Sequence, residues 1–207
     1  MASFALRMAR ELKILSDDPA PDVFAWLVNE DDLLDLDAII LGPESSPYAT
    51  GSFRLKIKLT DRYPFEPPQV RFITPIYHPN IDREGRICLD TLKMQPQGSW
   101  SPSININTLL LTIRLLLANP NADDGLVPDI TEQYTSDRVT FNKIAKELTQ
   151  REAVDKGKAD TTATSNNISN TELKNDHREN ILQATSTISS DNDNNNNSSS
   201  SSNSSSN

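Results

Sequence analysis

The chain has a single cysteine, Cys88, and a cysteine thiolate is an effective nucleophile. Most free cysteines are simply small, buried apolar residues, and the apolar neighbours Ile87 and Leu89 are compatible with partial burial. However, Cys88 lies within residues 75–102, a stretch rich in proline and glycine that has no regular hydrophobic pattern. Long irregular stretches inside compact domains usually carry function. We therefore treat Cys88 as a candidate nucleophile.

A cysteine hydrolase would also need a base, and the nearest histidine is His78, ten residues before Cys88. A base within hydrogen-bond reach would deprotonate the thiol. The spacing alone neither establishes nor excludes such a pair. A histidine beside a proline in a tight loop is more often a structural hydrogen-bonding residue, so a Cys–His hydrolase is retained here as an alternative.

Composition excludes several other classes of site. One cysteine permits neither an intramolecular disulfide nor a cysteine-based metal site, and the two histidines cannot form a histidine-rich one. We therefore expect no bound metal and no directly bound cofactor. The net charge of −9 argues against direct binding of nucleic acid, which requires a basic face. No apolar run approaches the roughly 20 residues that span a bilayer, and no signal peptide is recognised, so we expect an intracellular protein that does not bind membranes.

Hydrophobic periodicity predicts the elements that must position Cys88. An apolar stripe at helical spacing predicts a first helix over residues 1–16, and Arg7, Arg10, Glu11 and Lys13 lie off this stripe. Strands are predicted at residues 23–28, 36–41, 53–59 and 70–73. A central helix whose apolar residues nearly encircle it, and which should therefore be buried, is predicted at 105–117, and two C-terminal helices at 126–133 and 136–151.

This order of elements predicts the α+β class. Short connections between the strands favour an antiparallel meander of four strands, with the helices segregated from the sheet. The catalytic domain is predicted to cover residues 1–151. Residues 152–207 are polar and become almost purely serine and asparagine, so we expect a disordered tail that buries too little apolar surface to fold.

Five motifs, taken together, resemble those of the ubiquitin-conjugating enzymes in order and spacing. They are Tyr63-Pro64-Phe65-Glu66-Pro67-Pro68, His78-Pro79-Asn80, Ile87-Cys88-Leu89-Asp90, Trp100-Ser101-Pro102 and Pro120-Asn121-Ala122-Asp123-Asp124. Each motif alone is a weak signal, whereas five in register are specific. The resemblance covers residues 5–151, and over residues 62–92 it is closest to the T-type branch, which acts in the Fanconi anaemia DNA-repair pathway.

The resemblance implies an acyltransferase that uses Cys88, Asn80 and Asp124. Cys88 would carry ubiquitin as a thioester, and Asn80 would serve the oxyanion, either directly through its amide or by fixing its loop. The alternative for Asn80 is a turn-forming residue after proline. Asp124 matches the family's acidic gate position and would orient an attacking amine, with a solvated loop acid as its alternative. Ala122 and Gly125 stand where proline is frequent in the family, which we expect to loosen this loop.

Further residues are assigned by the same resemblance. The family binds the RING domain of a ubiquitin ligase through positions that match Arg7, Phe65, Ser101 and Pro102. Trp100 is expected to pack inward, and Tyr63-Pro64 to be a cis peptide bond. Lys93, five residues after Cys88, is a candidate for self-modification if its loop folds back.

The implied partners are ubiquitin, a ubiquitin-activating enzyme, a RING-type ligase and a protein substrate. ATP would be consumed by the activating enzyme and not bound here. Two alternatives remain: a conjugating enzyme for another ubiquitin-like modifier, and a non-catalytic module that only positions ubiquitin. The presence of both Cys88 and Asn80 disfavours the second. By resemblance we expect a nuclear protein with a role in DNA repair, with the cytoplasm as the alternative compartment.

Overall fold

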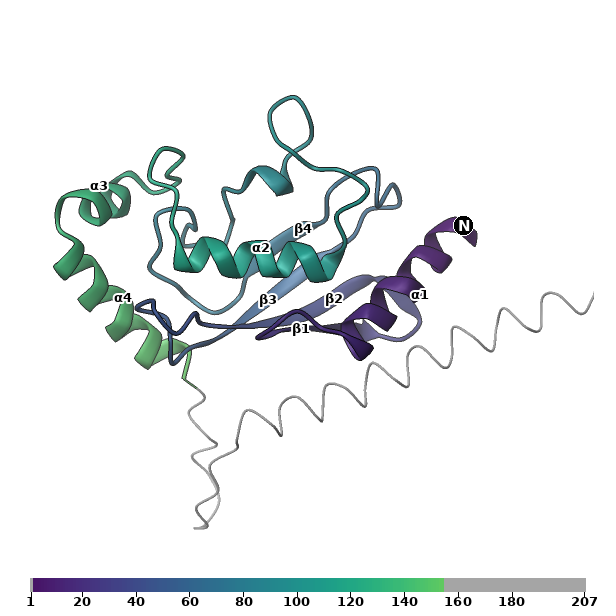
Figure 1. Cartoon of the computed structure of the whole chain (residues 1–207), viewed down its shortest axis with the longest axis horizontal. Coiled ribbons are helices and arrows are strands. Elements are labelled where there is room, and N and C mark those ends of the chain that lie inside the picture. The colour runs from purple at the N-terminus through teal and green to yellow at the C-terminus, as the bar shows by residue number, and fades with distance from the viewer. Residues whose placement is uncertain (1, 155–207) are drawn as a thin grey trace, which may run out of the picture.

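The structure is a computed structural model that describes residues 2–154, and the tail predicted at 152–207 falls almost entirely outside the described residues. The elements, in chain order, are α1 (Ala2–Asp17), β1 (Val23–Asn29), β2 (Asp32–Leu41), β3 (Ser52–Lys58), β4 (Gln69–Phe72), the 3-10 turn η1 (Asp90–Leu92), α2 (Ile106–Ala118), α3 (Pro128–Ser136) and α4 (Arg138–Glu152). The predicted order of elements, one helix, four strands, an irregular stretch and three helices, is confirmed (Figure 1).

The four strands form one antiparallel sheet in the order β1-β2-β3-β4, as the short connections predict. Strand β3 illustrates why the alternation of apolar and charged residues predicts a strand. Phe53, Leu55 and Ile57 are buried on the inner face, whereas Arg54 and Lys58 are exposed on the outer face. Because successive side chains of a strand point to opposite faces, this pattern fixes which face of the sheet meets the core.

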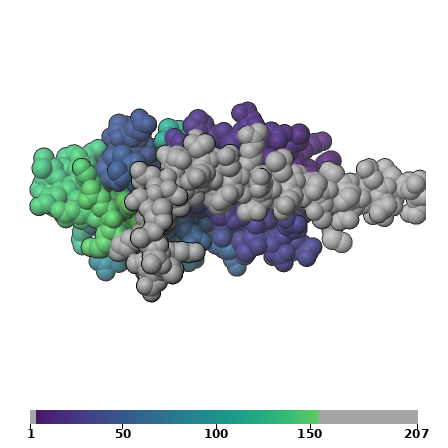
Figure 2. All heavy atoms as spheres, turned by 90° about the horizontal axis from the view of Figure 1, so that it is seen from below, coloured from purple at the N-terminus to yellow at the C-terminus, as the bar shows by residue number. Residues whose placement is uncertain are grey.

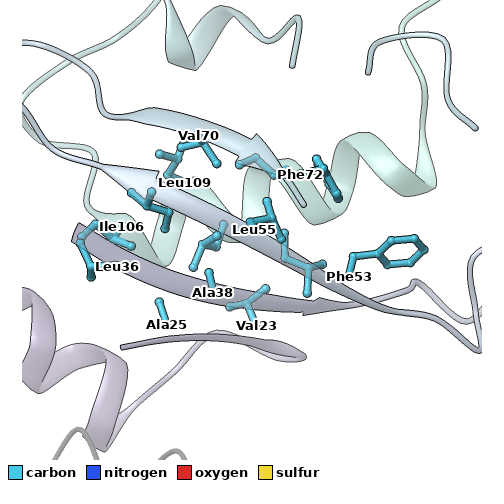
Figure 3. Packing of buried hydrophobic residues seen from close by; sticks show 14 of the residues in the cluster. Val23, Ala25, Leu36, Ala38, Phe53, Leu55, Val70, Phe72, Ile106 and Leu109 are labelled. Atoms are coloured by element: carbon cyan, nitrogen blue, oxygen red, sulfur yellow. The ribbon is translucent and has the colours of Figure 1, made fainter. Parts of the chain in front are cut away.

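Helix α2 covers the inner face of the sheet. Ile106 and Leu109 pack among the inward side chains of the strands, including Leu36 and Leu55 (Figure 3). The prediction of a fully buried central helix is only partly correct, because Leu115 is 52% exposed. A helix that rests on one sheet keeps a solvent-facing side, even when that side carries leucine.

The remaining helices lie at the two ends of the sheet. Helix α1 contacts α2 and β1, and α3 packs against α4 at the opposite end, an arrangement visible in both overall views (Figures 1 and 2). Helix α3 begins at Pro128, two residues later than predicted, because the residue before a proline is disfavoured in the helical conformation and Val127 is extended. The N–H groups of Leu126 and Val127 both donate to the carbonyl of Pro79. No helix within residues 2–154 is long and apolar enough to cross a bilayer.

Candidate active site

Cys88 is held by the backbone of the irregular stretch that precedes it. Its N–H donates to the carbonyl of Asn80 at 2.8 Å, and Ile81 forms an isolated antiparallel bridge with Ile87. Between Ile81 and Ile87 the chain reverses in a tight turn, in which Asp82 Oδ1 accepts the N–H of Arg86 at 2.9 Å. The turn therefore places Cys88 directly beside Asn80.

Gly85 makes this turn possible. Its φ of 77° lies in the left-handed region that side chains disfavour. In addition, a Cβ at this position would lie 2.0 Å from the carbonyl oxygen of Phe72. The carbonyl of Gly85 accepts the N–H of Phe72 at 2.9 Å, so the turn is tied to the last residue of β4.

Asn80 is completely buried and its side chain is fully engaged. Its amide nitrogen donates to the carbonyls of Asn121 at 2.7 Å and Asp124 at 2.9 Å, and its amide oxygen accepts the N–H of Asn121 at 2.9 Å. An asparagine amide has two donor hydrogens, and both are used here. Of the two roles that the resemblance allowed, these contacts correspond to fixing the loop that carries Asp124.

His78 is also completely buried, and both of its ring nitrogens have partners. Nδ1 accepts the N–H of Asn80 at 3.0 Å, and this bond assigns the hydrogen to Nε2, which donates to the carbonyl of Leu116 at 3.0 Å. Burial lowers the pKa of His78 to about 4, so the ring is neutral at physiological pH. Because neither nitrogen is left for Cys88, His78 is not a catalytic base, and the hydrolase alternative loses the base that was considered for it.

The thiol of Cys88 forms a triangle with a cation and an anion. The thiol donates to Asp124 Oδ2 at 3.0 Å, the ammonium of Lys93 donates to Sγ at 3.2 Å, and Lys93 Nζ lies 3.1 Å from the same Asp124 oxygen. A second carboxylate, Asp90, lies 3.7 Å from Lys93. The structure thus brings Cys88, Asn80, Asp124 and Lys93 together, although they span 45 positions of the chain.

The charges of this triangle act on the thiol in opposite directions. Burial and the carboxylate of Asp124 raise the pKa of Cys88, whereas the ammonium of Lys93 opposes that rise. The pKa of Lys93 is raised by its bonds to Cys88 and Asp124, and the pKa of Asp124 is lowered by its bonds to Cys88 and Lys93. In the free protein the thiol is therefore mostly protonated at neutral pH, and the ammonium and carboxylate are fully charged.

Sequence reasoning missed the pairing of Lys93 with Asp124. The two residues are 31 positions apart, and no periodic pattern connects them. Within residues 2–154 no group of three or more histidine, cysteine or acidic side chains is arranged to hold a metal ion.

Of the residues expected to bind a ligase, Arg7 lies on α1, and Phe65, Ser101 and Pro102 lie on loops. Phe65 is 69% exposed, and the guanidinium of Arg7 donates to the carbonyl of Pro102 at 2.8 Å. Trp100 packs inward as predicted, with only 4% of its surface exposed, and donates its indole N–H to the carbonyl of Pro64 at 2.9 Å. The predicted cis bond at Tyr63-Pro64 is present, together with one at Gln95-Pro96 that was not predicted.

Comparison with known proteins agrees with this arrangement. The family model described as ubiquitin-conjugating enzyme matches residues 7–149. The protein named ubiquitin-conjugating enzyme E2 T from Mus musculus is 50% identical over 156 residues, which cover 75% of this chain and 76% of the relative. The protein of the same name from Homo sapiens is 49% identical over 156 residues, or 75% and 79% of the two chains.

A third relative of that name, from Danio rerio, is 43% identical over 182 residues, which cover 88% of this chain and 93% of the relative. The family match spans the sheet, the loop that carries Cys88 and nearly all of α4. The chain therefore belongs to the ubiquitin-conjugating enzyme family and is similar to its members named E2 T.

Proposed function

We propose that this enzyme accepts ubiquitin from an activating enzyme as a thioester on Cys88 and transfers it to a lysine of a protein substrate. In the first step the thiolate of Cys88 attacks the thioester of the activating enzyme, whose own thiolate leaves. In the second step a substrate amine attacks the new thioester, an amide bond forms, and the thiolate of Cys88 is released. The observation that carries the proposal is the position of the only cysteine beside Asn80 and Asp124, within the loop that the family motif predicts.

The second step requires a deprotonated amine and a stabilised oxyanion. The carboxylate of Asp124, already at hydrogen-bond distance from an ammonium, is suited to orient an incoming lysine. Asn80 contributes by holding the backbone at Asn121 and Asp124, which keeps that carboxylate beside Cys88. In this role Asn80 is a positioning residue in the free enzyme.

Lys93 is proposed as the site of self-modification. Its amine lies 3.2 Å from Sγ, so no rearrangement of the loop is needed to bring it to a thioester formed there. Holding two reacting groups close together in one molecule greatly raises the rate of their reaction. Modification of Lys93 would place a whole ubiquitin beside Cys88 and so block further transfer.

For partners, we propose a RING-type ligase that docks on Arg7, Phe65, Ser101 and Pro102. An exposed phenylalanine next to a polar rim is the kind of residue that anchors an interface. By its resemblance to the T-type branch, we further propose a role in DNA repair in the nucleus. ATP acts through the activating enzyme, and we propose no cofactor bound to this chain.

The decisive experiment is a charging assay with activating enzyme, ATP and ubiquitin, read on a non-reducing gel. A band heavier by one ubiquitin should appear with the wild-type protein, vanish on treatment with thiol reductant, and be absent in Cys88→Ala. An Asp123→Asn variant, changed at a neighbouring loop acid that does not contact Cys88, should charge normally. No band alongside an active control enzyme would overturn the proposal, and charging only by another ubiquitin-like modifier would reassign it.

A further inference from the structure

Glu11 of α1 is a buried carboxylate that joins three parts of the molecule. Its side chain is 2% exposed. Oε1 accepts from the guanidinium of Arg7 and from the hydroxyl of Tyr63, the latter at 2.6 Å. Oε2 accepts the N–H of Ile106, the first residue of α2, at 2.7 Å. One carboxylate thus holds together α1, the turn before Phe65 and the beginning of α2.

Arg7 extends this connection to the second predicted docking segment. Besides its bond to Glu11, its guanidinium donates to the carbonyls of Pro102 at 2.8 Å and Ile104 at 2.9 Å. It also lies over the ring of Tyr63, 5.7 Å from the ring centre. Only 25% of the Arg7 side chain is exposed, so most of its hydrogen-bonding capacity is used inside the molecule.

The side chain of Trp100 also belongs to this connected set of side chains. Its indole N–H donates to the carbonyl of Pro64, the residue before Phe65, and its ring lies 6.0 Å from that of Tyr63. Both segments that present exposed docking residues, the turn at Phe65 and the loop at Ser101 and Pro102, are therefore fixed from beneath by the same connected set of side chains.

The stability of this buried set of polar side chains depends on complete hydrogen bonding. A buried carboxylate is tolerated only when it is paired and hydrogen-bonded, and Glu11 accepts three bonds. Removal of one partner leaves the others unsatisfied, so the set holds or loosens as a unit. Preorganised surfaces bind more tightly because less conformational freedom is lost on association.

We propose that Glu11 and Arg7 are positioning residues, which hold the turn at Phe65 and the loop at Pro102 in the geometry that a RING domain binds. Arg7 acts mainly through the backbone carbonyls of Pro102 and Ile104 and only secondarily by touching the partner. This inference rests on the proposed docking of a RING-type ligase, and its consequence for the free protein can be measured without any ligase.

The first test is amide hydrogen exchange of the free protein. In Glu11→Gln and in Arg7→Lys, the amides of Phe65 and Ile104 should exchange about tenfold faster, because their turns lose their support. The amide of Cys88, bonded to Asn80, should keep its wild-type rate. Arg10→Lys, an exposed change on the same helix, is the matched control and should alter neither group. Unchanged exchange at Phe65 and Ile104 would overturn the inference.

The second test is the discharge of thioester-linked ubiquitin to free lysine, with and without a RING domain that accelerates the wild-type reaction. Glu11→Gln should raise the RING concentration needed for half-maximal acceleration about tenfold, while the rate without RING stays at the wild-type value. Tyr63→Phe, which removes a single hydroxyl, should shift the same value in the same direction and keeps the test informative if Glu11→Gln folds poorly. If both variants need the same RING concentration as the wild-type protein for half-maximal acceleration, the inference is refuted.

The two tests separate the inference from the proposed function. Failure of every RING domain to accelerate the wild-type protein would refute ligase docking, and amide exchange would then decide by itself whether Glu11 and Arg7 position the two segments.

Discussion

At the scale of single residues, the main feature is a thiol that lies between an ammonium and a carboxylate. Lys93 favours the thiolate of Cys88, whereas Asp124 and burial favour the thiol, and the balance leaves the thiol pKa raised. A raised thiol pKa suits the carrier role that we propose for Cys88. The sulfur is a good nucleophile once deprotonated, and its small thiolate fraction at neutral pH slows its reaction with other electrophiles.

The first prediction concerns this balance. In Asp124→Asn the pKa of Cys88 should fall, because the anion that opposes thiolate formation is gone, and the pH profile of alkylation by iodoacetamide should shift to lower pH. In Lys93→Gln the profile should shift to higher pH. Because Cys88 is the only cysteine, the alkylation rate reports on it alone. Asp123→Asn is the control, and an upward shift in Asp124→Asn would contradict the prediction.

The same Asp124→Asn change should slow aminolysis although it makes the thiol more acidic. The thioester has no titrating thiol, so only the orientation of the incoming amine is then affected. We expect discharge to free lysine to fall by about 10²-fold, in the range of a lost positioned acid–base group. Single-turnover discharge of pre-charged enzyme measures this step, and an unchanged rate would remove Asp124 from the transfer.

Self-modification provides a third prediction. Lys93→Arg keeps the positive charge beside Cys88 and Asp124 but removes the nucleophilic amine, so self-modified product should fall by about tenfold or more as proximity is lost. Charging itself should change little, because the charge is kept. Lys58→Arg, on the exposed outer face of the sheet, is the control. Undiminished self-modification would show that another lysine is the acceptor.

His78 gives a fourth prediction, which concerns stability against pH. Its folded pKa of about 4 lies below the ordinary 6.5, so it stabilises the fold fully above pH 6.5, and this contribution is lost progressively as pH falls towards 4. From pH 7 to pH 5 the free energy of unfolding should drop by about 2 kcal/mol from this group.

Urea unfolding measures that loss, and NMR titration in a His177→Gln background assigns it, because His78 is then the only histidine. An imidazole that titrates near 6.5 in the folded protein would contradict the buried, neutral state.

At the scale of elements, the sequence predicted what is periodic and missed what is held by long-range polar contacts. The strands were identified because alternation reports directly on the two faces of a sheet. Asn80 shows the opposite case, since its partners Asn121 and Asp124 lie 41 and 44 positions away and leave no pattern in the sequence. The family motif suggested their association, and only the three-dimensional arrangement gives its geometry.

The burial of Glu11 was also not predicted, for a different reason. Spacing placed it off the apolar stripe of the first helix, among side chains that ordinarily face solvent, yet it is 2% exposed. The polar face of α1 meets the turn at Tyr63 and the beginning of α2, and their hydrogen-bond donors make burial of the carboxylate tolerable. Periodicity separates apolar from polar faces, but it does not show which polar face is covered.

The turn before Cys88 gives the prediction at this scale. Gly85→Ala should destabilise the protein by about 1–3 kcal/mol, because φ is positive and the added Cβ meets the carbonyl of Phe72. Charging should fall as well, since the turn places Cys88 beside Asn80. Denaturant unfolding and the charging assay measure the two effects. Arg83→Ala, an exposed change in the same turn, is the control, and equal effects of the two variants would contradict the assigned role of Gly85.

At the scale of the whole molecule, α2 connects the two functional regions. Its first residue, Ile106, donates its N–H to Glu11 beneath the proposed docking loops, and the carbonyl of Leu116 near its other end accepts from His78 beside the catalytic loop. The 13-residue helix is about 20 Å long. The proposed docking loops and the catalytic loop are thus anchored near opposite ends of one helix, so a partner at the proposed docking loops need not obstruct Cys88.

The boundary of the folded unit is the last prediction. Helix α4 ends at Glu152, and the next residue, Ala153, is 3% exposed, with its carbonyl accepting the N–H of Ser52 at 2.8 Å at the beginning of β3. The described fold therefore uses contacts slightly beyond the predicted boundary at residue 151. A chain that ends after Val154 should match the full-length protein in its free energy of unfolding and its charging rate.

A chain that ends after Arg151 should lose about 2 kcal/mol, from one buried side chain and the hydrogen bonds of Ala153. Urea unfolding of the three chains compares the stabilities directly. Equal stability of the two shortened chains would show that Ala153 contributes nothing. Loss of charging in the chain that ends after Val154 would show that residues 155–207 belong to the catalytic unit.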